Sequence, residues 1–272
     1  MSSIFIIQLV ISFFVGGGLV SLLTFLAEKS SSKVSGLILS FPSTILISFF
    51  FLAWTQSTEE VATIIPATFI PMGVSILFPV FYIYFARLGS KFINGRIQLI
   101  LFSLGSSTSI WVALSIPMAY HKMTNIGFGI IGYILLAILG HILLNRKKSS
   151  EVQSHSYTIW QIMARAAFVG LLVALVVFLG EISNPFWGGV LAIYPAALSA
   201  SLIVIHWYYG HESLFGLCRK IPLGSLSIFI YAIVVMLVFP NFGFVLGTVV
   251  ALICSLATSF LLSHLSKFPK KI

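Results

Sequence analysis

Hydroxyl-bearing residues and prolines inside long apolar segments are the groups in this sequence that could do chemistry. Pro42 and Pro195 each lie well inside such a segment and have hydroxyl-bearing neighbours. A proline within a helix frees a backbone carbonyl, and in lipid that carbonyl must be satisfied by a neighbour, a hydroxyl or water. Carbonyls and hydroxyls of this kind can line a path for a small solute or an ion. The alternative for each proline is a packing kink, at which small residues let two helices approach closely.

Residues 103–109, Ser-Leu-Gly-Ser-Ser-Thr-Ser, form the most polar run inside any apolar segment. These hydroxyls could coordinate a cation or line a wet path, or they could bond to their own helix and simply pack. Because hydroxyls and carbonyls are neutral, such a site suits a neutral solute or a monovalent cation better than an anion. The predicted binding residues are Pro42, Ser43, Thr44, Ser48, Ser106, Ser107, Ser109, Tyr194, Pro195, Ser199 and Ser201.

Charged residues near the ends of apolar segments are predicted to have a gating or vestibule role. Glu28, Glu59, Glu181 and Glu212 flank such segments, and Arg165 lies about six residues inside one. A charge at that depth is costly in lipid, so Arg165 is expected either to pair with Glu28 or to extend to the headgroup zone. The alternative for each glutamate is an ordinary solvated residue that caps or flanks its helix.

The composition excludes a soluble enzyme. Of the 272 residues, 59% are hydrophobic and 8% are charged, with a mean hydropathy of +1.10, whereas a soluble domain is about 45–50% apolar and about 25% charged. The chain has six Glu and no Asp, and His-Glu-x-x-His, Cys-x-x-Cys and Gly-x-Ser-x-Gly patterns do not occur in it. No metal, cofactor or enzymatic function is therefore expected. The net charge of +9 is concentrated in loops between apolar segments, so no nucleic acid is expected as a partner.

Nine apolar segments are long enough to cross a bilayer as helices, which takes about 20 residues each. They are residues 4–27, 34–55, 61–86, 97–119, 124–145, 159–181, 186–208, 213–239 and 241–264. Alternate loops differ in charge: one set carries most of the Lys and Arg, and the other carries Glu59, Glu60, Lys122 and Glu181. The positive-inside rule then predicts a multi-pass protein of the cell (inner) membrane, with the N-terminus outside and the C-terminus in the cytoplasm.

An internal repeat divides the chain. Residues 17–59 align without a gap on residues 170–212, at an offset of 153. After a two-residue shift, Ile70-Pro71-Met72-Gly73 matches Ile221-Pro222-Leu223-Gly224. Residue types that are scarce in the chain, or that rarely match by chance in an apolar helix, form the identical pairs Gly17/Gly170, Glu28/Glu181, Gly36/Gly189, Pro42/Pro195, Trp54/Trp207 and Glu59/Glu212.

Five spans separate equivalent helices, and an odd number inverts the second copy in the membrane. We therefore predict an all-α polytopic membrane helix bundle of two inverted-topology repeats. The first repeat is residues 1–123, a linker helix and basic loop are residues 124–158, and the second repeat is residues 159–272. A competing division makes the fourth span the linker, because Asn125-Ile126-Gly127-Phe128 resembles Asn241-Phe242-Gly243-Phe244.

The segments from Gly36 to Gly73 and from Gly189 to Gly224 share a pattern of Gly, [Phe/Tyr]-Pro, Glu and Ile-Pro-[Met/Leu]-Gly. In this pattern the chain resembles the small four-helix GlpM-type membrane proteins, a group linked to alginate production. The resemblance implies a membrane-helix fold and carries over no catalytic or binding residue. The architecture is also similar to that of fused dual-topology transporters of the drug/metabolite class.

Two functions follow from these features. The first is a secondary transporter or permease for a small neutral or cationic solute or ion, with its site between the second, fourth and seventh spans. The alternative is a non-transporting membrane protein that assists envelope polysaccharide or lipid assembly. The lipid bilayer is the expected partner, and the oligomeric state stays open, with a homodimer as one possibility.

Overall fold

The protein is a bundle of apolar helices. A computed structural model describes residues 3–29, 42–145 and 158–265, and every regular element in these ranges is helical. Seven helical segments in this part of the chain are long and apolar enough to cross a membrane. Large apolar side chains such as Phe14, Leu101 and Leu246 are exposed on the outside of the bundle. Such a surface belongs in lipid, so the chain is a helical membrane protein.

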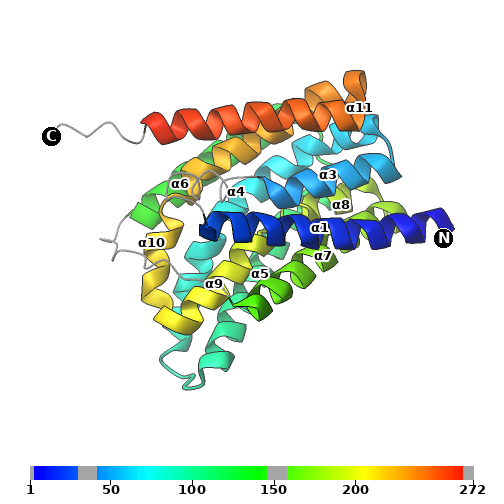
Figure 1. Cartoon of the computed structure of the whole chain (residues 1–272). Coiled ribbons are helices and arrows are strands. Elements are labelled where there is room, and N and C mark those ends of the chain that lie inside the picture. The colour runs from blue at the N-terminus through cyan, green and yellow to red at the C-terminus, as the bar shows by residue number, and fades with distance from the viewer. Residues whose placement is uncertain (1–2, 30–41, 146–157, 266–272) are drawn as a thin grey trace.

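The helices follow one another along the chain as Figure 1 shows. They are α1 (Ser3–Lys29), α3 (Ser43–Thr55), α4 (Thr58–Gly89), α5 (Arg96–Tyr120), α6 (Ile126–Asn145), α7 (Ile159–Ile182), α8 (Pro185–Leu191), α9 (Ala196–Tyr209), the 3₁₀ turn η1 (His211–Ser213), α10 (Leu214–Cys218) and α11 (Ile221–Leu265).

Local sequence explains where several helices begin. The Ser57 hydroxyl accepts a hydrogen bond from the backbone N–H of Glu60 and caps α4. Thr158 and Gln161 form a capping box at the start of α7. Asn184 caps α8, whose first residue is a proline. Each cap satisfies backbone N–H groups that have no partner within the first turn of a helix.

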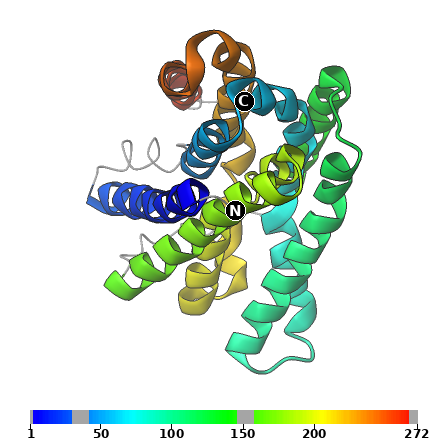
Figure 2. The same cartoon turned by 90° about the vertical axis from the view of Figure 1, so that its right-hand side faces the viewer.

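Helix α4 is the centre of the bundle. It is the most buried of the long helices, and Val61, Phe69, Phe78 and Tyr82 on it are fully buried. It contacts α5, α6, α8 and α11. Figure 2 shows α1 on one side of the bundle and α5 and α6 on the other. Three prolines interrupt the hydrogen-bond ladder of α4, so this central helix carries freed carbonyls into the core.

Helix α11 consists of two helices that meet at Gly243. This residue has φ 71° and ψ 172°, a backbone conformation that favours glycine. The chain reverses there, as Figure 1 shows, and a Cβ added to Gly247 would lie 2.5 Å from Phe239 in the preceding half. The residue ranges 213–239 and 241–264 were predicted as separate spans, and this turn divides α11 between them.

Helices α1 and α7 cross in close contact. A Cβ added to Gly17 would lie 2.6 Å from the carbonyl oxygen of Ala166, and one added to Gly170 would lie 2.5 Å from that of Phe13. The partner numbers fall along α7 as they rise along α1, so the two helices are antiparallel. Small residues let two backbones approach in this way, and van der Waals contact then holds the helices together.

Contacts between the connecting segments show which of them lie at the same end of the bundle. At one end, Arg87 contacts Glu212, Arg96 contacts Trp207 and Arg219 contacts Asn145. We call this the basic end; it also holds Lys91 and Lys220. At the opposite end, Gln56 contacts Glu181, and Glu59 shares a pocket with Thr124 and Pro240. We call this the acidic end. The predicted charge difference between alternate loops therefore appears as a difference between the two ends of the bundle.

Substituting Ala for Gly17 should destabilise the bundle. The added methyl group would press on the Ala166 carbonyl, and overpacking of this kind costs about 1–3 kcal/mol. Thermal unfolding of the purified protein in detergent should show a lower midpoint for Gly17→Ala and for Gly170→Ala. The matched control is Gly18→Ala, because a Cβ at Gly18 has no neighbour within 4 Å. Equal midpoints for Gly17→Ala and Gly18→Ala would contradict the close crossing.

Candidate functional site

The candidate site is the interruption between α8 and α9. These two helices together are long enough to cross a membrane, but residues 192–195 between them are not helical. Pro195 is the N-cap of α9, with φ −79° and ψ 59°. Pro42 is the N-cap of α3 with nearly the same backbone, φ −76° and ψ 48°. The expected kink within a continuous helix is therefore wrong for Pro195, since its segment is broken into two helices.

Ser75 of α4 satisfies the broken backbone. Its hydroxyl lies 2.9 Å from the carbonyl oxygens of Ile193, in the interruption, and of Pro71, one turn earlier in α4. The Trp111 indole N–H of α5 donates to the same hydroxyl at 2.8 Å. One side chain thus joins α4, α5 and the interruption. A carbonyl without such a donor would cost about 1–3 kcal/mol in this buried environment.

Tyr194 closes the interruption on the α5 side. Its hydroxyl is 2.8 Å from that of Thr108, and its ring makes edge contacts with Trp111, Phe78 and Phe168. Tyr194 is 8% exposed, and Trp111 is 1% exposed. In this conformation the polar groups around the interruption are covered by aromatic rings and bonded to one another.

The other predicted hydroxyls differ in burial and in hydrogen-bond partner. Ser107, Ser199 and Ser201 each donate to a carbonyl of their own helix, four residues earlier. The Ser48 hydroxyl is fully buried and has no hydrogen-bond partner among the described residues.

Residues that are only partly buried complete the predicted set. Ser43 and Thr44 in the first turn of α3 and Ser106 on α5 are partly buried, whereas Ser109 is exposed on the outer face of α5. The structure therefore joins Tyr194 to α5 through Thr108, which lies beside the predicted serines. Ser109 points away from this cluster.

The charged residues of the prediction belong to the two ends. Glu212 pairs with Arg87, and Glu181 accepts a hydrogen bond of 2.7 Å from Gln56. Glu59 is exposed at the start of α4. The side chain of Glu28 lies outside the part of the chain whose side chains are described.

Arg165 is partly buried near the start of α7. Because Ala166 lies opposite Gly17, Arg165 is level with about Gly18 of α1. Glu28 is ten residues further along α1, or about 15 Å at 1.5 Å per residue. Both predicted arrangements of Arg165, the pair with Glu28 and the extension toward the headgroup zone of the basic end, stay predictions, because the side chain of Glu28 lies outside the described side chains.

Sequence reasoning missed two polar groups in the core. The first is Ser75 with Trp111; its signal was the position of Ser75 as the single hydroxyl residue between Pro71 and Pro79. The second is a buried pair in which the Tyr82 hydroxyl lies 3.0 Å from Nδ1 of His206. It gave no comparable signal, because its partners are 124 residues apart.

His206 also contacts His211, which lies beside Glu212 at the basic end. Burial lowers the pKa of His211, Glu212 opposes this shift, and Arg87 adds to it. His211 is therefore harder to protonate than an ordinary histidine. The chain of Tyr82, His206 and His211 joins the buried face of α4 to the basic end.

Among the described residues no group of three or more His, Cys, Asp or Glu side chains could hold a metal ion. Comparisons of the chain with protein-family models, with curated proteins and with solved structures find no match. The site must therefore be interpreted from its own geometry.

Replacing Ser75 by Ala should destabilise the core. The change leaves the Ile193 carbonyl and the Trp111 N–H without their partner, and the expected cost is about 1–3 kcal/mol. Chemical or thermal unfolding followed by tryptophan fluorescence would measure it. The exposed Ser109→Ala on α5 serves as the control and should unfold like the wild type. A Ser75→Ala variant as stable as that control would show that Ser75 does not support the interruption.

Proposed function

We propose that the chain consists of two inverted repeats in a nine-span arrangement. The contacts between α1 and α7 support this, because they are reciprocal: Gly17 faces Ala166, and Gly170 faces Phe13. Gly17 and Gly170 are equivalent under the offset of 153 found in the sequence, and so are Phe13 and Ala166. A reciprocal contact of this kind is the property of two copies related by a two-fold axis. The matching backbone at Pro42 and Pro195 supports the same relation.

The direction of the helices supports α6 as the linker between the repeats. Helix α5 runs from Arg96 at the basic end to the acidic end, and the second half of α11 runs the opposite way from Gly243. They are thus inverted equivalents. Nine spans result when the predicted span of residues 34–55, which contains α3, the pair α8 with α9, and the two halves of α11 are counted as four spans. The repeats are then residues 1–123 and 159–272.

The basic end is proposed to face the cytoplasm of a cell membrane. A phosphatase fused within residues 91–95, or after Ile272, should then be inactive in bacterial cells, because it needs the oxidising outer compartment. The same enzyme fused within residues 121–125, at the acidic end, should be active. Green fluorescent protein at the same places is the control and should give the opposite pattern. An active phosphatase after Ile272 would overturn both the orientation and the odd number of spans.

We propose that the protein is a secondary transporter or permease for a small neutral or cationic solute or ion. The observation that carries this proposal is the interruption between α8 and α9, with the partly buried hydroxyls of Ser75 and Thr108 directed at it. Broken helices near the middle of a membrane are the parts from which transporters build their sites. A purely structural helix has no need of a break that must be satisfied by a serine from another helix.

The packed aromatic cover indicates a closed conformation of this site. Tyr194 and Trp111 would have to move for a solute to reach the Ile193 carbonyl. This movement would replace the hydrogen bonds that Thr108 and Ser75 make in the closed conformation by hydrogen bonds to the solute. All of these groups are neutral, so they suit a neutral solute or a monovalent cation. Exchange of one hydrogen bond for another costs little net free energy, as a transport cycle requires.

Flux into vesicles tests the proposal. Purified protein in liposomes is assayed with sodium, potassium, methylammonium, urea and glycerol as probes. At least one probe should cross faster than in protein-free liposomes. The double variant Thr108→Val, Tyr194→Phe keeps the shape of the cluster and removes its hydrogen bond, so that flux should change by about two- to tenfold.

Ser109→Ala is the matched control for the flux assay and should behave as the wild type, because Ser109 is exposed on the same helix as Thr108. Absence of flux for every probe would instead favour a non-transporting protein that assists envelope polysaccharide or lipid assembly. Flux that ignores the double variant would place the path elsewhere in the bundle.

A further inference from the structure

The equivalent residues Glu59 and Glu212 differ in their surroundings. The Glu212 carboxylate accepts two hydrogen bonds from Arg87, from Nε at 2.7 Å and from Nη2 at 2.7 Å. The Arg87 guanidinium lies over the Phe215 ring, 4.7 Å from its centroid. The chain itself therefore supplies Glu212 with a cation, and Phe215 covers one face of that cation. Arginine is suited to this bidentate contact by its planar shape.

Glu59 has neither partner. Its carboxylate accepts a hydrogen bond of 3.2 Å from the Thr58 hydroxyl, and no basic side chain of the described residues lies within 4 Å of it. The exposed Lys122 of the neighbouring turn is also more than 4 Å from the Glu59 carboxylate. Under the offset of 153, Ala62 stands where the other copy has Phe215. Arg87 belongs to the first copy, and after the two-residue shift its equivalent in the second copy is Val238. A valine therefore takes the place of the arginine in the arrangement equivalent to that of Arg87 and Glu212.

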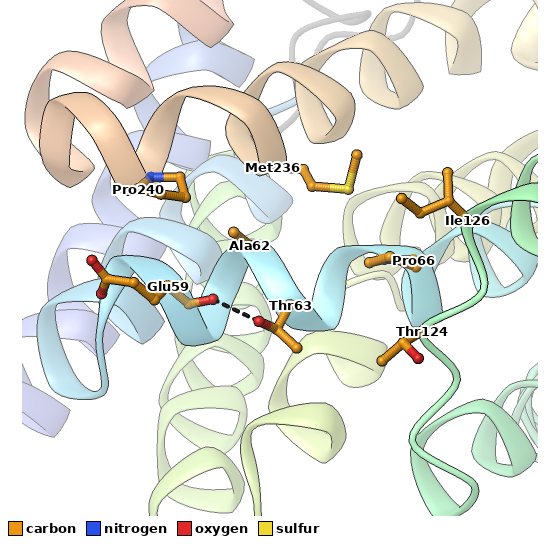
Figure 3. Close-up of a pocket in the computed structure, with 8 residues that line it drawn as sticks. All are labelled: Glu59, Ala62, Thr63, Pro66, Thr124, Ile126, Met236 and Pro240. Atoms are coloured by element: carbon orange, nitrogen blue, oxygen red, sulfur yellow. Dashed lines mark hydrogen bonds between the residues drawn. The ribbon is translucent and has the colours of Figure 1, made fainter.

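A pocket of about 420 Å³ opens at this place. Figure 3 shows Glu59 at one end of it and Thr124 at the other, with α4 below and α11 above. Small-molecule sites in proteins begin at about 300 Å³, so the space suits a small ligand. Apart from Thr63, the wall between the polar ends is apolar. The residues that line the pocket are Glu59, Ala62, Thr63, Pro66, Thr124, Ile126, Met236 and Pro240.

We propose that this pocket binds an amphipathic organic monocation. Its ammonium or guanidinium group lies beside the Glu59 carboxylate, as the Arg87 guanidinium lies beside Glu212, and its apolar body lies against Pro66, Ile126 and Met236. The proposal rests on the inverted repeats proposed above and deepens the transport function, because it names the substrate class and its binding place at the acidic end. The Thr63 hydroxyl is engaged with the Glu59 carbonyl at 2.9 Å, so the carboxylate is the main polar anchor.

The cation could come from two sources that share this chemistry. One is a free amine in solution, and the other is the ammonium of an ethanolamine lipid headgroup, because the pocket lies at the acidic end between helices. Both sources present N–H donors to a carboxylate, and a charge-assisted hydrogen bond of this kind is stronger than a neutral one.

Calorimetry on the full chain in phosphatidylcholine nanodiscs tests the proposal, with protein-free discs as the blank. The probe is 2-phenylethylamine, and its neutral isostere is 2-phenylethanol. The amine should bind at least about tenfold more tightly than the alcohol. Glu59→Gln should weaken the amine about ten- to hundredfold, as expected for a lost charge-assisted contact. Glu60→Gln is the matched control in the same helical turn and should bind like the wild type, because Glu60 does not line the pocket.

A second variant keeps the carboxylate and fills the space. Ala62→Phe introduces the ring that the other copy has at this position, so it should weaken the amine while Ala62→Ser leaves binding unchanged. Amine binding that is the same in the wild type, Glu59→Gln and Ala62→Phe would overturn the proposal, and so would equal binding of the amine and the alcohol.

Adding phosphatidylethanolamine to the discs separates the two sources. Competition with the probe in the wild type would assign the site to a lipid headgroup, and absence of competition would assign it to a free cation; each result supports a cation site at Glu59. The outcome is separable from that of the flux assay. Binding that depends on Glu59 without flux would overturn transport alone, and flux without binding at Glu59 would overturn this inference alone.

Discussion

Backbone groups in lipid must be hydrogen-bonded within the protein, and this structure depends on how that demand is met at the break between α8 and α9. Ser75 meets it at the Ile193 carbonyl. For this to happen, α4 must pass directly beside the break and α5 must bring Trp111 to the same hydroxyl. The central position of α4 and the close packing of α5 on it therefore place a donor at a carbonyl that would otherwise be unsatisfied. The prolines of α4 free further carbonyls in the same region, one of which is that of Ser75 itself.

Close packing then depends on small residues. Lipid chains are as apolar as leucine, so helices in a membrane associate through contact and not through exclusion of water. A Cβ at Gly188 of α8 would lie 2.7 Å from the Val176 carbonyl of α7, and one at Gly189 would lie 2.6 Å from Ile64 of α4. These two glycines admit the short helix α8 between its neighbours. The same principle operates at the crossing of α1 and α7, where Gly17 and Gly170 take equivalent roles.

Much of this fold could be predicted from the sequence, because lipid imposes simple rules. Apolar length and loop charge predicted the membrane class, the bounds of most helices and the sorting of charge to two ends. The targets of hydroxyls could not be predicted in the same way. Ser107, Thr108 and Ser109 are consecutive but behave differently. The Ser107 hydroxyl bonds to its own helix, the Thr108 hydroxyl bonds to Tyr194, and Ser109 faces outward. Successive residues of a helix point about 100° apart, so the hydrogen-bond partner of each hydroxyl depends on which neighbouring helix lies on its side. The break at Pro195 was likewise predicted as a kink. A full interruption is stable here because Ser75 of α4 bonds to the Ile193 carbonyl, and the sequence does not show that these two residues meet.

The two ends of the bundle differ in a way that bears on the proposed transport cycle. At the basic end, Arg87 joins α4 to Glu212, and Arg96 joins α5 to the Trp207 carbonyl of α9. At the acidic end, Glu59 is exposed beside an open pocket. The Arg87 and Glu212 side chains are 32% and 60% exposed, and a pair so accessible to solvent contributes about 0–1 kcal/mol to stability. Contacts of this strength can form and break in every cycle. If the chain is built as the proposed pair of inverted copies, one with a closed charge pair and one with an open carboxylate, it suits the proposed transport cycle, in which an internal cation is exchanged for an external one.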